Sequence, residues 1–476
     1  MNKFKLFMDN FLVYGLGSMI AKIIPLIMLP IITRLIPDPS FYGLFDLSNT
    51  ITSFGTAFAI MGMYDAMFRY FFEKEDLDYR RDICSTTLVF TTVTSILVFF
   101  LMLIFHEELA VYVFSDSQYG ILVYLTAIAT LIGATNGIIS APTRMQNKRK
   151  IFLVTNTLSP LLGYAVSIPL LLQGYYLIAL PLAGIISSFL IEIIFAWLNR
   201  SFFNIRCFHW NYLKQLLSIA LPLAPAFFVY WIFNSSDRLM ITNLIGVEAT
   251  GIYSIGSKLG LASQLIYQAF AGGWQYFAFS TMHEDNQVKS NSLIFEYLGL
   301  VSFIACMFIC AICKVFYEIL FAGSYVQGYI VSPYLFLAPL LLMLYQVASN
   351  QFLVIKKTLP SALILFIGAL SNVGLNFILI PYMGVEGAGL ATLLGYIISV
   401  ALVMMLLIHM NLMDVSKRFY IASIIMFLFF VIWRNFLLGH PIYEMLFAVL
   451  GSSILILLYR RDIWKFIDRK SGRNQL

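Results

Sequence analysis

Three charged residues stand inside two hydrophobic segments that meet between Asn234 and Lys258. Asp237 and Arg238 lie in the first segment, and Lys258 lies in the second. A charged side chain at the centre of a bilayer costs about 2.5–3.5 kcal/mol, so such residues normally face protein or water rather than lipid. The three residues therefore indicate either an internal ion pair or a polar site for a charged solute.

The two interpretations differ in what compensates these charges. In the structural one, Asp237 pairs with Arg238 or Lys258 and locks two helices together. In the functional one, Arg238 and Lys258 face a polar cavity and bind an anionic solute, because both side chains donate charge-assisted hydrogen bonds. The sequence leaves both interpretations open.

The composition is that of an integral membrane protein. Of the 476 residues, 60% are hydrophobic and 11% are charged, and the mean hydropathy is +0.86. The net charge of +6 does not indicate nucleic-acid binding, because the basic residues are spread over short loops. Five cysteines, of which three share one apolar segment without a histidine, predict neither a disulfide framework nor a metal site.

Repeated apolar runs of about 20 residues predict an all-α, polytopic membrane protein with about 14 transmembrane helices. The first run follows Lys3 and Lys5 but is too long for the hydrophobic region of a signal peptide, so we expect an uncleaved span. The predicted spans are 11–35, 43–68, 83–105, 120–141, 151–172, 176–198, 216–245, 251–279, 292–313, 331–354, 360–381, 385–409, 419–436 and 441–459.

The distribution of Lys and Arg predicts how these spans are oriented, because cytoplasmic loops hold most of the basic residues. With the N-terminus inside, 24 of the 30 Lys and Arg residues fall in inner segments. Only Arg34, Lys314 and Arg434 fall in outer loops. We therefore expect both termini to be cytoplasmic. The outer connections are also short, which leaves no room there for an enzyme site.

A short motif recurs after six spans. Ile32-Thr-Arg-Leu-Ile36 precedes Gly43-Leu-Phe-Asp-Leu-Ser48 at the turn between spans 1 and 2. Ile241-Thr-Asn-Leu-Ile245 precedes Gly251-Ile-Tyr-Ser-Ile-Gly256 at the turn between spans 7 and 8. Because six is even, the two copies have the same orientation in the membrane, which is a parallel repeat about an axis along the membrane normal.

The repeat predicts four parts of the chain. Residues 1–198 form an N-lobe of spans 1–6, and residues 216–409 form a C-lobe of spans 7–12 related to it by pseudo-two-fold symmetry. A cytoplasmic linker, 199–215, joins the lobes, and residues 410–476 supply two extra helices and a basic cytoplasmic tail. The glycines of the turn from Gly384 to Gly389 follow a span rather than a strand, so we assign them to close helix packing.

Four more ionisable residues lie in or near the predicted spans. Lys22 is near the midplane of span 1 and Arg34 is near its outer end; each is either a cation of the cavity or a side chain that reaches the interface. Asp46 lies early in span 2, where it pairs with Arg34 or binds a coupling cation. Glu192 has no neighbouring partner in sequence and is a candidate for proton coupling.

Several of these motifs together resemble a known family. They are Tyr14, Lys22 and Pro25 in span 1, Phe41-Tyr-Gly43, Asp237-Arg-Leu-Met-Ile241, and the turns Gly246 to Tyr253 and Gly384 to Gly389. The chain resembles the polysaccharide-biosynthesis flippases of O-antigen and capsule repeat units, over residues 1 to about 410. That family belongs to a superfamily that also contains multidrug extruders and the lipid II flippase.

The resemblance implies a transporter rather than an enzyme, which carries an undecaprenyl-diphosphate-linked oligosaccharide from the inner to the outer leaflet by alternating access. It implies a bacterial cytoplasmic (inner) membrane and, as partners, membrane lipids, a polysaccharide polymerase and chain-length machinery.

The resemblance also implies roles for the charged residues. Lys22, Arg34, Arg238 and Lys258 would bind the diphosphate. Asp46, Asp237 and Glu192 would serve proton or sodium coupling or charge pairing, with no other cofactor. Aromatic side chains such as Trp231 are assigned to packing, with stacking on sugar rings as the alternative.

Three other functions remain as alternatives. The cavity cations are equally compatible with transport of lipid II. A cation-coupled multidrug extruder of the same superfamily would favour acidic and aromatic cavity residues instead. A membrane polymerase or glycosyltransferase would need a sizeable polar loop or domain with catalytic groups, which this sequence lacks.

Overall fold

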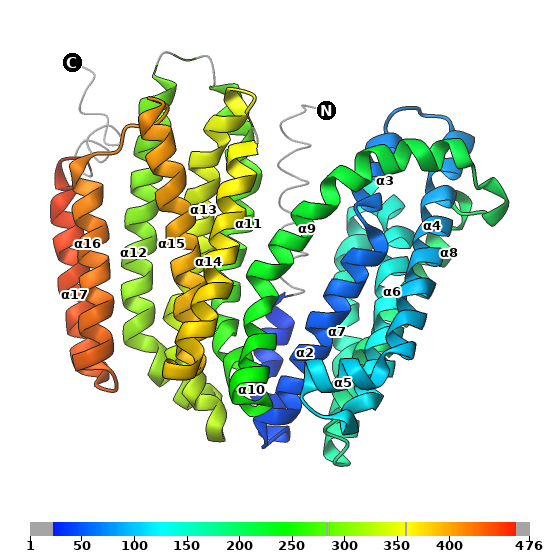
Figure 1. Ribbon diagram of the computed structural model, residues 1–476, viewed down its shortest axis with the longest axis horizontal. Helices are drawn as coiled ribbons and strands as arrows, with labels where there is room; N and C mark the ends of the chain where they lie inside the picture. The colour runs from blue at the N-terminus through cyan, green and yellow to red at the C-terminus, as the bar shows by residue number, and fades with distance from the viewer. Residues whose placement is uncertain (1–21, 282–283, 285, 358, 463–476) are drawn as a thin grey trace. The chain divides into compact units, whose positions relative to one another are not determined.

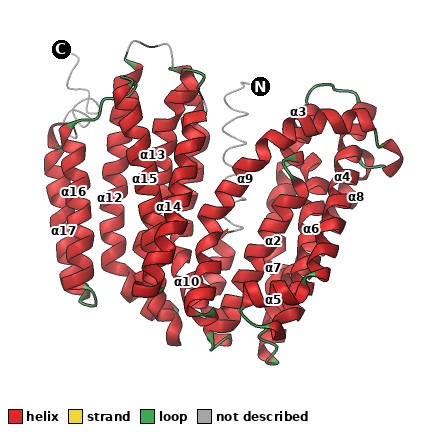
Figure 2. Cartoon of the chain, viewed as in Figure 1, coloured by secondary structure: helices red, strands yellow, loops and turns green. Residues whose placement is uncertain are grey.

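The computed structural model describes residues 22–281, 284, 286–357 and 359–462, and every regular element in these residues is helical (Figure 2). The predicted all-α membrane fold is confirmed. Ten segments among the described residues are long and apolar enough to cross a membrane. They are Leu77–Ile104 (α4), Ser117–Met145 (η1 and α6), Arg149–Leu172 (α7), Ala179–Leu198 (α8), Gln287–Leu320 (α12), Ser332–Val354 (α13), Leu359–Met383 (α14), Val385–His409 (α15), Lys417–Leu437 (α16 and η6) and Pro441–Leu458 (α17).

The other four predicted spans, 1, 2, 7 and 8, carry most of the candidate site residues. Span 1 is helical over 22–35, and span 2 corresponds to α2, Pro39–Ile60. Span 7 lies within α9, Trp210–Ile245, and span 8 is divided into α10, Val247–Gly256, and α11, Gly260–Ser280. The charged side chains within these segments make them candidates for function.

Two of the predicted spans differ from the structure in their continuity. Span 2 was expected to continue to residue 68, but α2 ends at Met61 and Gly62, whose φ angles of 45° and 78° cannot continue a right-handed helix. The chain then forms the short helix α3, Met63–Phe71. Span 8 is interrupted by a 3-10 turn, η4, Ser257–Leu259. The outer connection at 106–119 is itself largely helical, as α5, His106–Phe114, and η1, Ser117–Tyr119.

The chain forms two compact units. Unit 1 comprises Met1–Ser254 with Ala322–Tyr325. Its helices α4, α6 and α8 pack side by side, with α2 and α7 against them. Near one end of α9, Leu216 and Ala220 join a buried core with Met67 of α3 and Ile83 of α4. Figure 1 shows the first part of α9 crossing the ends of α3 and α4 before the helix turns along α2.

Unit 2 comprises Ile255–Phe321 and Val326–Leu476. Its helices α11, α12 and α15 pack against α13, and α14 packs against α15. Helix α17 lies against α12 (Figure 1). The buried Glu296 of α12 ties the last two helices to the unit: its carboxylate accepts hydrogen bonds from the Ser416 amide at 2.6 Å and from the Tyr459 hydroxyl at 3.1 Å. The predicted division of the chain into two six-helix lobes, joined by residues 199–215, is based on the sequence repeat and not on contacts between helices. It remains a prediction.

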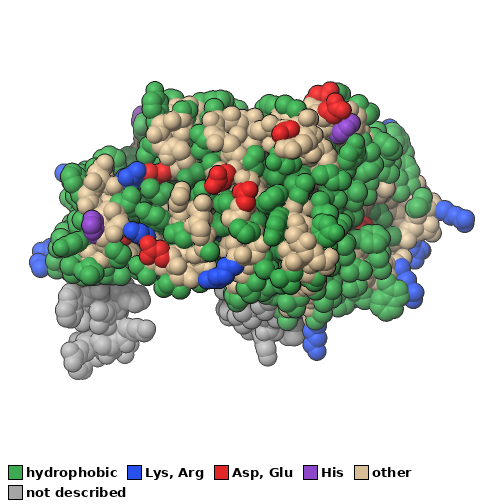
Figure 3. All heavy atoms as spheres, turned by 90° about the horizontal axis from the view of Figure 1, so that it is seen from below, with side chains coloured by type: hydrophobic (Ala, Val, Ile, Leu, Met, Phe, Trp, Pro, Cys, Tyr) green, Lys and Arg blue, Asp and Glu red, His purple; other side chains and the backbone are tan. Residues whose placement is uncertain are grey.

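The surface supports the assignment to a membrane. Large apolar side chains are exposed along the outer faces of the helices, including Leu97 and Phe100 of α4 and Ile424 and Phe427 of α16. Figure 3 looks onto the ends of the helices, where hydrophobic side chains still cover much of the surface and Lys, Arg, Asp and Glu lie at scattered places. Exposed apolar surface of this extent is unfavourable in water and favourable in lipid.

Candidate functional site

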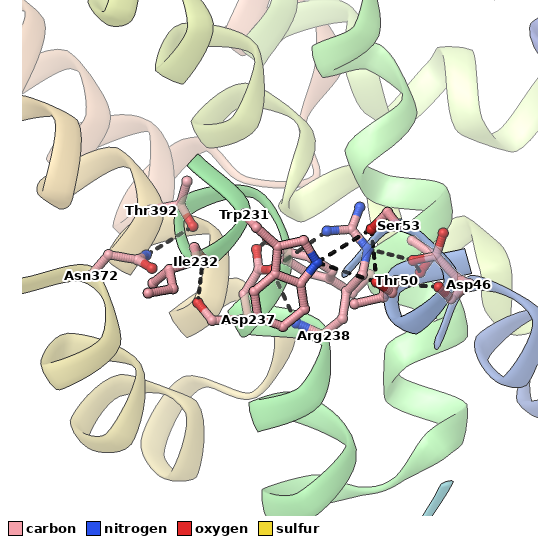
Figure 4. Close-up of polar contacts among 12 residues, drawn as sticks. Asp46, Thr50, Ser53, Trp231, Ile232, Asp237, Arg238, Asn372 and Thr392 are labelled. Atoms are coloured by element: carbon pink, nitrogen blue, oxygen red, sulfur yellow. Dashed lines mark hydrogen bonds and ion pairs between the residues drawn. The ribbon is translucent and has the colours of Figure 1, made fainter. Parts of the chain in front are cut away.

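The helices of unit 1 bring Asp46 of α2 together with Asp237 and Arg238 of α9. Both carboxylates are almost completely buried, with 8% and 3% of the residue exposed. Arg238 Nε lies 2.5 Å from Asp46 Oδ2, and Arg238 Nη1 lies 3.5 Å from Asp237 Oδ1. Figure 4 shows the guanidinium of Arg238 directed toward Asp46. The contact joins residues that are 192 positions apart in the sequence.

Hydroxyl groups of α10 complete this cluster. Ser254 Oγ donates to Asp46 Oδ2 at 2.6 Å, and the Tyr253 hydroxyl donates to Asp237 Oδ2. The backbone amide of Arg238 donates to Asp237 Oδ1 at 3.0 Å. The guanidinium also lies over the ring of Tyr253, 5.8 Å from its centroid. We call these five residues the Asp46–Arg238 cluster.

The cluster contains two carboxylates for one guanidinium. With all three ionised its net charge is −1, so it disfavours a further anion near Arg238. The sequence-based interpretation of Asp237 and Arg238 as an ion pair agrees with this geometry, but the shorter contact of Arg238 is with Asp46. The sequence predicts that Asp46 pairs with Arg34 or binds a coupling cation; in the structure its carboxylate forms an ion pair with Arg238.

The two copies of the sequence motif meet at this point. Asp46 and Ser254 hold equivalent positions, three residues after Gly43 and Gly251. A Cβ atom on Gly43 would lie 2.4 Å from the Val247 carbonyl oxygen, and one on Gly251 would lie 2.0 Å from the Pro39 carbonyl oxygen. Because neither glycine has a side chain, the backbone of each copy can approach the other closely. This close contact of α2 with α10 places Asp46 next to Ser254.

The remaining sequence candidates of unit 1 lie at separate places on its helices. Lys22 is half-buried at the start of the described part of its helix. Arg34 is exposed, and its Nη1 donates to the Pro30 carbonyl at 3.1 Å. Glu192 of α8 is half-buried and hydrogen-bonds the side chain of Thr135 of α6. The predicted roles of these residues stay predictions.

Lys258, in unit 2, lies within the 3-10 turn that separates α10 from α11. Short 3-10 segments inside longer helices often mark functional hinges. Gly256 precedes the turn, and its carbonyl accepts hydrogen bonds from the hydroxyls of Tyr317 at 3.1 Å and Ser332 at 2.8 Å. These hydroxyls satisfy a carbonyl that an uninterrupted helix would bond internally. The half-buried lysine is thus placed at a stabilised break in a membrane helix.

This combination of buried charge and broken helices is typical of membrane transporters, and the comparisons with known proteins agree. The family model described as "Polysaccharide biosynthesis protein" matches residues 31–329, more than half of the chain. The chain belongs to this family. No curated protein matches the chain.

Solved structures show the same fold in transporters. The lipid II flippase MurJ in an inward closed conformation is similar with a TM-score of 0.73 and 15% sequence identity, over 95% of this chain and 100% of that chain. An inward-facing multidrug resistance MATE family transporter of the MOP superfamily has a TM-score of 0.63 and 14% identity, over 83% and 98%. A MOP superfamily transporter from Pyrococcus furiosus has a TM-score of 0.56 and 14% identity, over 84% and 96%.

Unit 2 of this family member contains an apolar groove with a volume of about 670 Å³. Side chains of α12, α13, α15 and α16 line it, among them Phe303, Leu337 and Met426. Arg434 and Asn435, which lie in the π-helical turn η6, Trp433–Leu437, add polar groups at the end of α16. Tyr334, Tyr420 and Ser423 are further polar residues of the lining. The groove therefore combines a long apolar wall with hydrogen-bond donors.

Sequence reasoning missed the partner that holds Arg434. Glu386 of α15 is 3% exposed, and its Oε1 accepts from Arg434 Nε at 2.5 Å and from the Tyr334 hydroxyl at 2.9 Å. In the sequence, Arg434 falls in an outer loop and Glu386 falls in the turn from Gly384 to Gly389. The turn does have the predicted close packing, since a Cβ on Gly387 would lie 2.3 Å from the Leu379 carbonyl.

A second group that the sequence did not single out lies between α14 and α15. Asn372, Asn376 and Thr392 are buried, and Asn372 Nδ2 donates to Thr392 Oγ1 at 3.1 Å (Figure 4). Within the described residues, Asn376 has no partner for either side-chain polar atom. Asparagine within an apolar span carries no charge, so a search for charged residues passes over it.

Proposed function

We propose that the protein is a flippase for an undecaprenyl-diphosphate-linked oligosaccharide, which it moves from the inner to the outer leaflet of a bacterial cytoplasmic membrane by alternating access. The observation that carries the proposal is the groove of unit 2, because a long apolar wall with donors at Arg434 and Asn435 suits an amphiphile with a long hydrocarbon chain. Membership of the polysaccharide biosynthesis family supports a glycan as the cargo.

The charged residues of the membrane helices would have two roles in this transport. Lys22, Arg34 and Lys258 would compensate the diphosphate, because their side chains donate charge-assisted hydrogen bonds to anions. The Asp46–Arg238 cluster would act as a latch between α2 and α9, which carry the two copies of the repeat. Asp46, Asp237 or Glu192 would take a proton or sodium ion when coupling requires it, because cation binding at these carboxylates changes the charge balance of the latch.

The proposed role involves no bond chemistry and places both termini in the cytoplasm. A polymerase and chain-length machinery would then act on the exported repeat unit. Transport of lipid II is the second candidate, because the groove suits its hydrocarbon chain equally. The fold it shares with MurJ is compatible with that substrate.

Reconstitution tests the proposal directly. Purified protein is placed in vesicles that contain undecaprenyl-diphosphate oligosaccharide, and an external glycosidase reports how much glycan reaches the outer leaflet. We expect nearly all of the glycan to become accessible with the protein, against about half in protein-free vesicles, where the two leaflets do not exchange. Exchange of lipid II but not of the oligosaccharide-bearing lipid would select the second candidate, and exchange of neither would contradict both.

Filling the groove should block transport. Ser423→Trp places an indole among the lining residues of α16, so we expect at least a tenfold lower flipping rate with little change in stability. Ser453→Trp is the matched control, because Ser453 of α17 is exposed and, like Ser423, donates only to the carbonyl four residues earlier. The flipping assay compares both variants with wild type. Equal rates for all three would show that the groove is not used.

A further inference from the structure

Four aromatic side chains of unit 1 form a platform on α2 and α9. The ring centroids of Phe54 and Trp231 are 4.8 Å apart, those of Phe54 and Phe228 are 5.8 Å apart, and those of Phe58 and Phe228 are 6.2 Å apart. Phe58 is 43% exposed and the other three are half-buried, so the rings retain accessible surface. None of the four belongs to the buried clusters around Met67 and around Leu44.

The platform shares its helix faces with polar groups. On α2, Phe54 and Phe58 continue the stripe that begins with Asp46 and Thr50, at intervals of four residues. On α9, Phe228 and Trp231 lie on the stripe that ends with Arg238, at intervals of three or four. The partly exposed rings therefore lie within a few helical turns of the buried Asp46–Arg238 cluster, on the same two helices.

Hydrogen bonds hold the indole of Trp231 in place. Its Nε1 donates to the Thr50 carbonyl at 3.2 Å and to Ser53 Oγ at 3.3 Å, as Figure 4 shows. Ser53 is exposed beside the ring. A fixed aromatic face with an adjacent hydroxyl offers apolar contact and hydrogen bonding at the same place.

We propose that this platform, Phe54, Phe58, Phe228 and Trp231, is a binding subsite for a sugar ring of the cargo. The inference rests on the proposed function and names which part of the cargo binds here. A pyranose ring presents C–H groups on its faces and hydroxyls at its edge, which matches aromatic rings next to Ser53. The neighbouring Asp46–Arg238 cluster, with two carboxylates for one guanidinium, disfavours the diphosphate at this position. The subsite therefore takes the glycan rather than the anionic linkage.

The experiment compares two lipids that differ only in the glycan. Full-length protein in detergent is titrated with undecaprenyl-diphosphate oligosaccharide and with undecaprenyl diphosphate, and binding is measured for wild type, Trp231→Phe, Trp231→Leu and Phe58→Leu. We expect Trp231→Leu and Phe58→Leu to weaken binding of the glycan-bearing lipid about tenfold and to leave the sugar-free lipid unchanged. Trp231→Phe keeps a ring and should lose less. Trp197→Leu is the control, since Trp197 of α8 is 66% exposed and lies outside the platform.

The outcomes separate the subsite from the proposed function. Equal weakening for both lipids would overturn the subsite, because the rings would then contact the hydrocarbon chain or support the fold. Unchanged binding of both lipids would overturn it as well. If wild type binds the two lipids equally, the glycan is not recognised at all, and the proposed cargo fails together with the subsite. Phe58→Leu keeps the test valid if Trp231→Leu does not fold, because Phe58 is the most exposed ring.

Discussion

Replacing Arg238 with Gln is expected to abolish glycan export and to destabilise the protein by about 3–5 kcal/mol, because it leaves two buried carboxylates without their cation. Asp46 and Asp237 are 8% and 3% exposed, so water cannot replace the guanidinium. Residual hydrogen bonds from Ser254, Tyr253 and the amide at position 238 satisfy individual oxygens but carry no full positive charge. Thermal unfolding in detergent and surface glycan in cells measure the two effects.

The triple variant Asp46→Asn, Asp237→Asn, Arg238→Gln distinguishes a latch from structural ion pairing. Removing the guanidinium together with both of its carboxylate partners avoids an orphaned charge, so stability should return to within about 1 kcal/mol of wild type. We expect export to remain low, since the latch would no longer be available to hold one state of the transport cycle. Recovery of both stability and export would show that the cluster only supports the fold.

The sequence predicted the fold and the family because both depend on features that are local along the chain. Apolar runs of 20 residues define spans without knowledge of their neighbours, and the distribution of Lys and Arg gives a consistent orientation. The interruptions within spans 2 and 8 were harder to predict. Met61 and Gly62 interrupt an otherwise apolar segment through their φ angles, and the 3-10 turn at Lys258 depends on hydroxyls that Tyr317 and Ser332 bring from other helices.

The candidate site was predicted in its residues but not in its pairing. Asp46, Asp237 and Arg238 were selected because ionisable groups in apolar spans are expensive. Only the folded chain shows that Asp46 lies beside Arg238, since 192 residues separate them. The same holds for Glu386 and Arg434, which lie 48 residues apart in the sequence and form an ion pair in the fold. The sequence shows how many charged residues a span contains. The net charge of a site follows only when the contacts show which of these residues lie together.

The sequence repeat connects the predicted fold with the candidate site. Its glycines offer the most selective test of that connection. Gly43 and Gly251 are equivalent in the repeat, and each lies against the backbone of the other copy. Gly251→Ala would place a Cβ 2.0 Å from the Pro39 carbonyl oxygen, and Gly43→Ala would place one 2.4 Å from the Val247 carbonyl oxygen. Backbone atoms cannot rotate away as a side chain can, so α2 and α10 must separate.

We expect Gly251→Ala to destabilise the protein by about 3 kcal/mol, the upper part of the usual range for overpacking, and Gly43→Ala to cost somewhat less. Gly184→Ala in α8 is the control: no atom lies within 4 Å of its Cβ, and alanine in a helix favours folding by about 0.5–1 kcal/mol. Because Asp46 and Ser254 follow these glycines by three residues, separating the helices also draws Ser254 Oγ away from Asp46 Oδ2. Export by Gly251→Ala should therefore fall by more than its loss of stability explains. Adding Ser254→Ala to Gly251→Ala should lower export only slightly further, because the contact between Ser254 and Asp46 is already lost. A large additional loss in that double variant would show that the glycine contact and the ion cluster act independently.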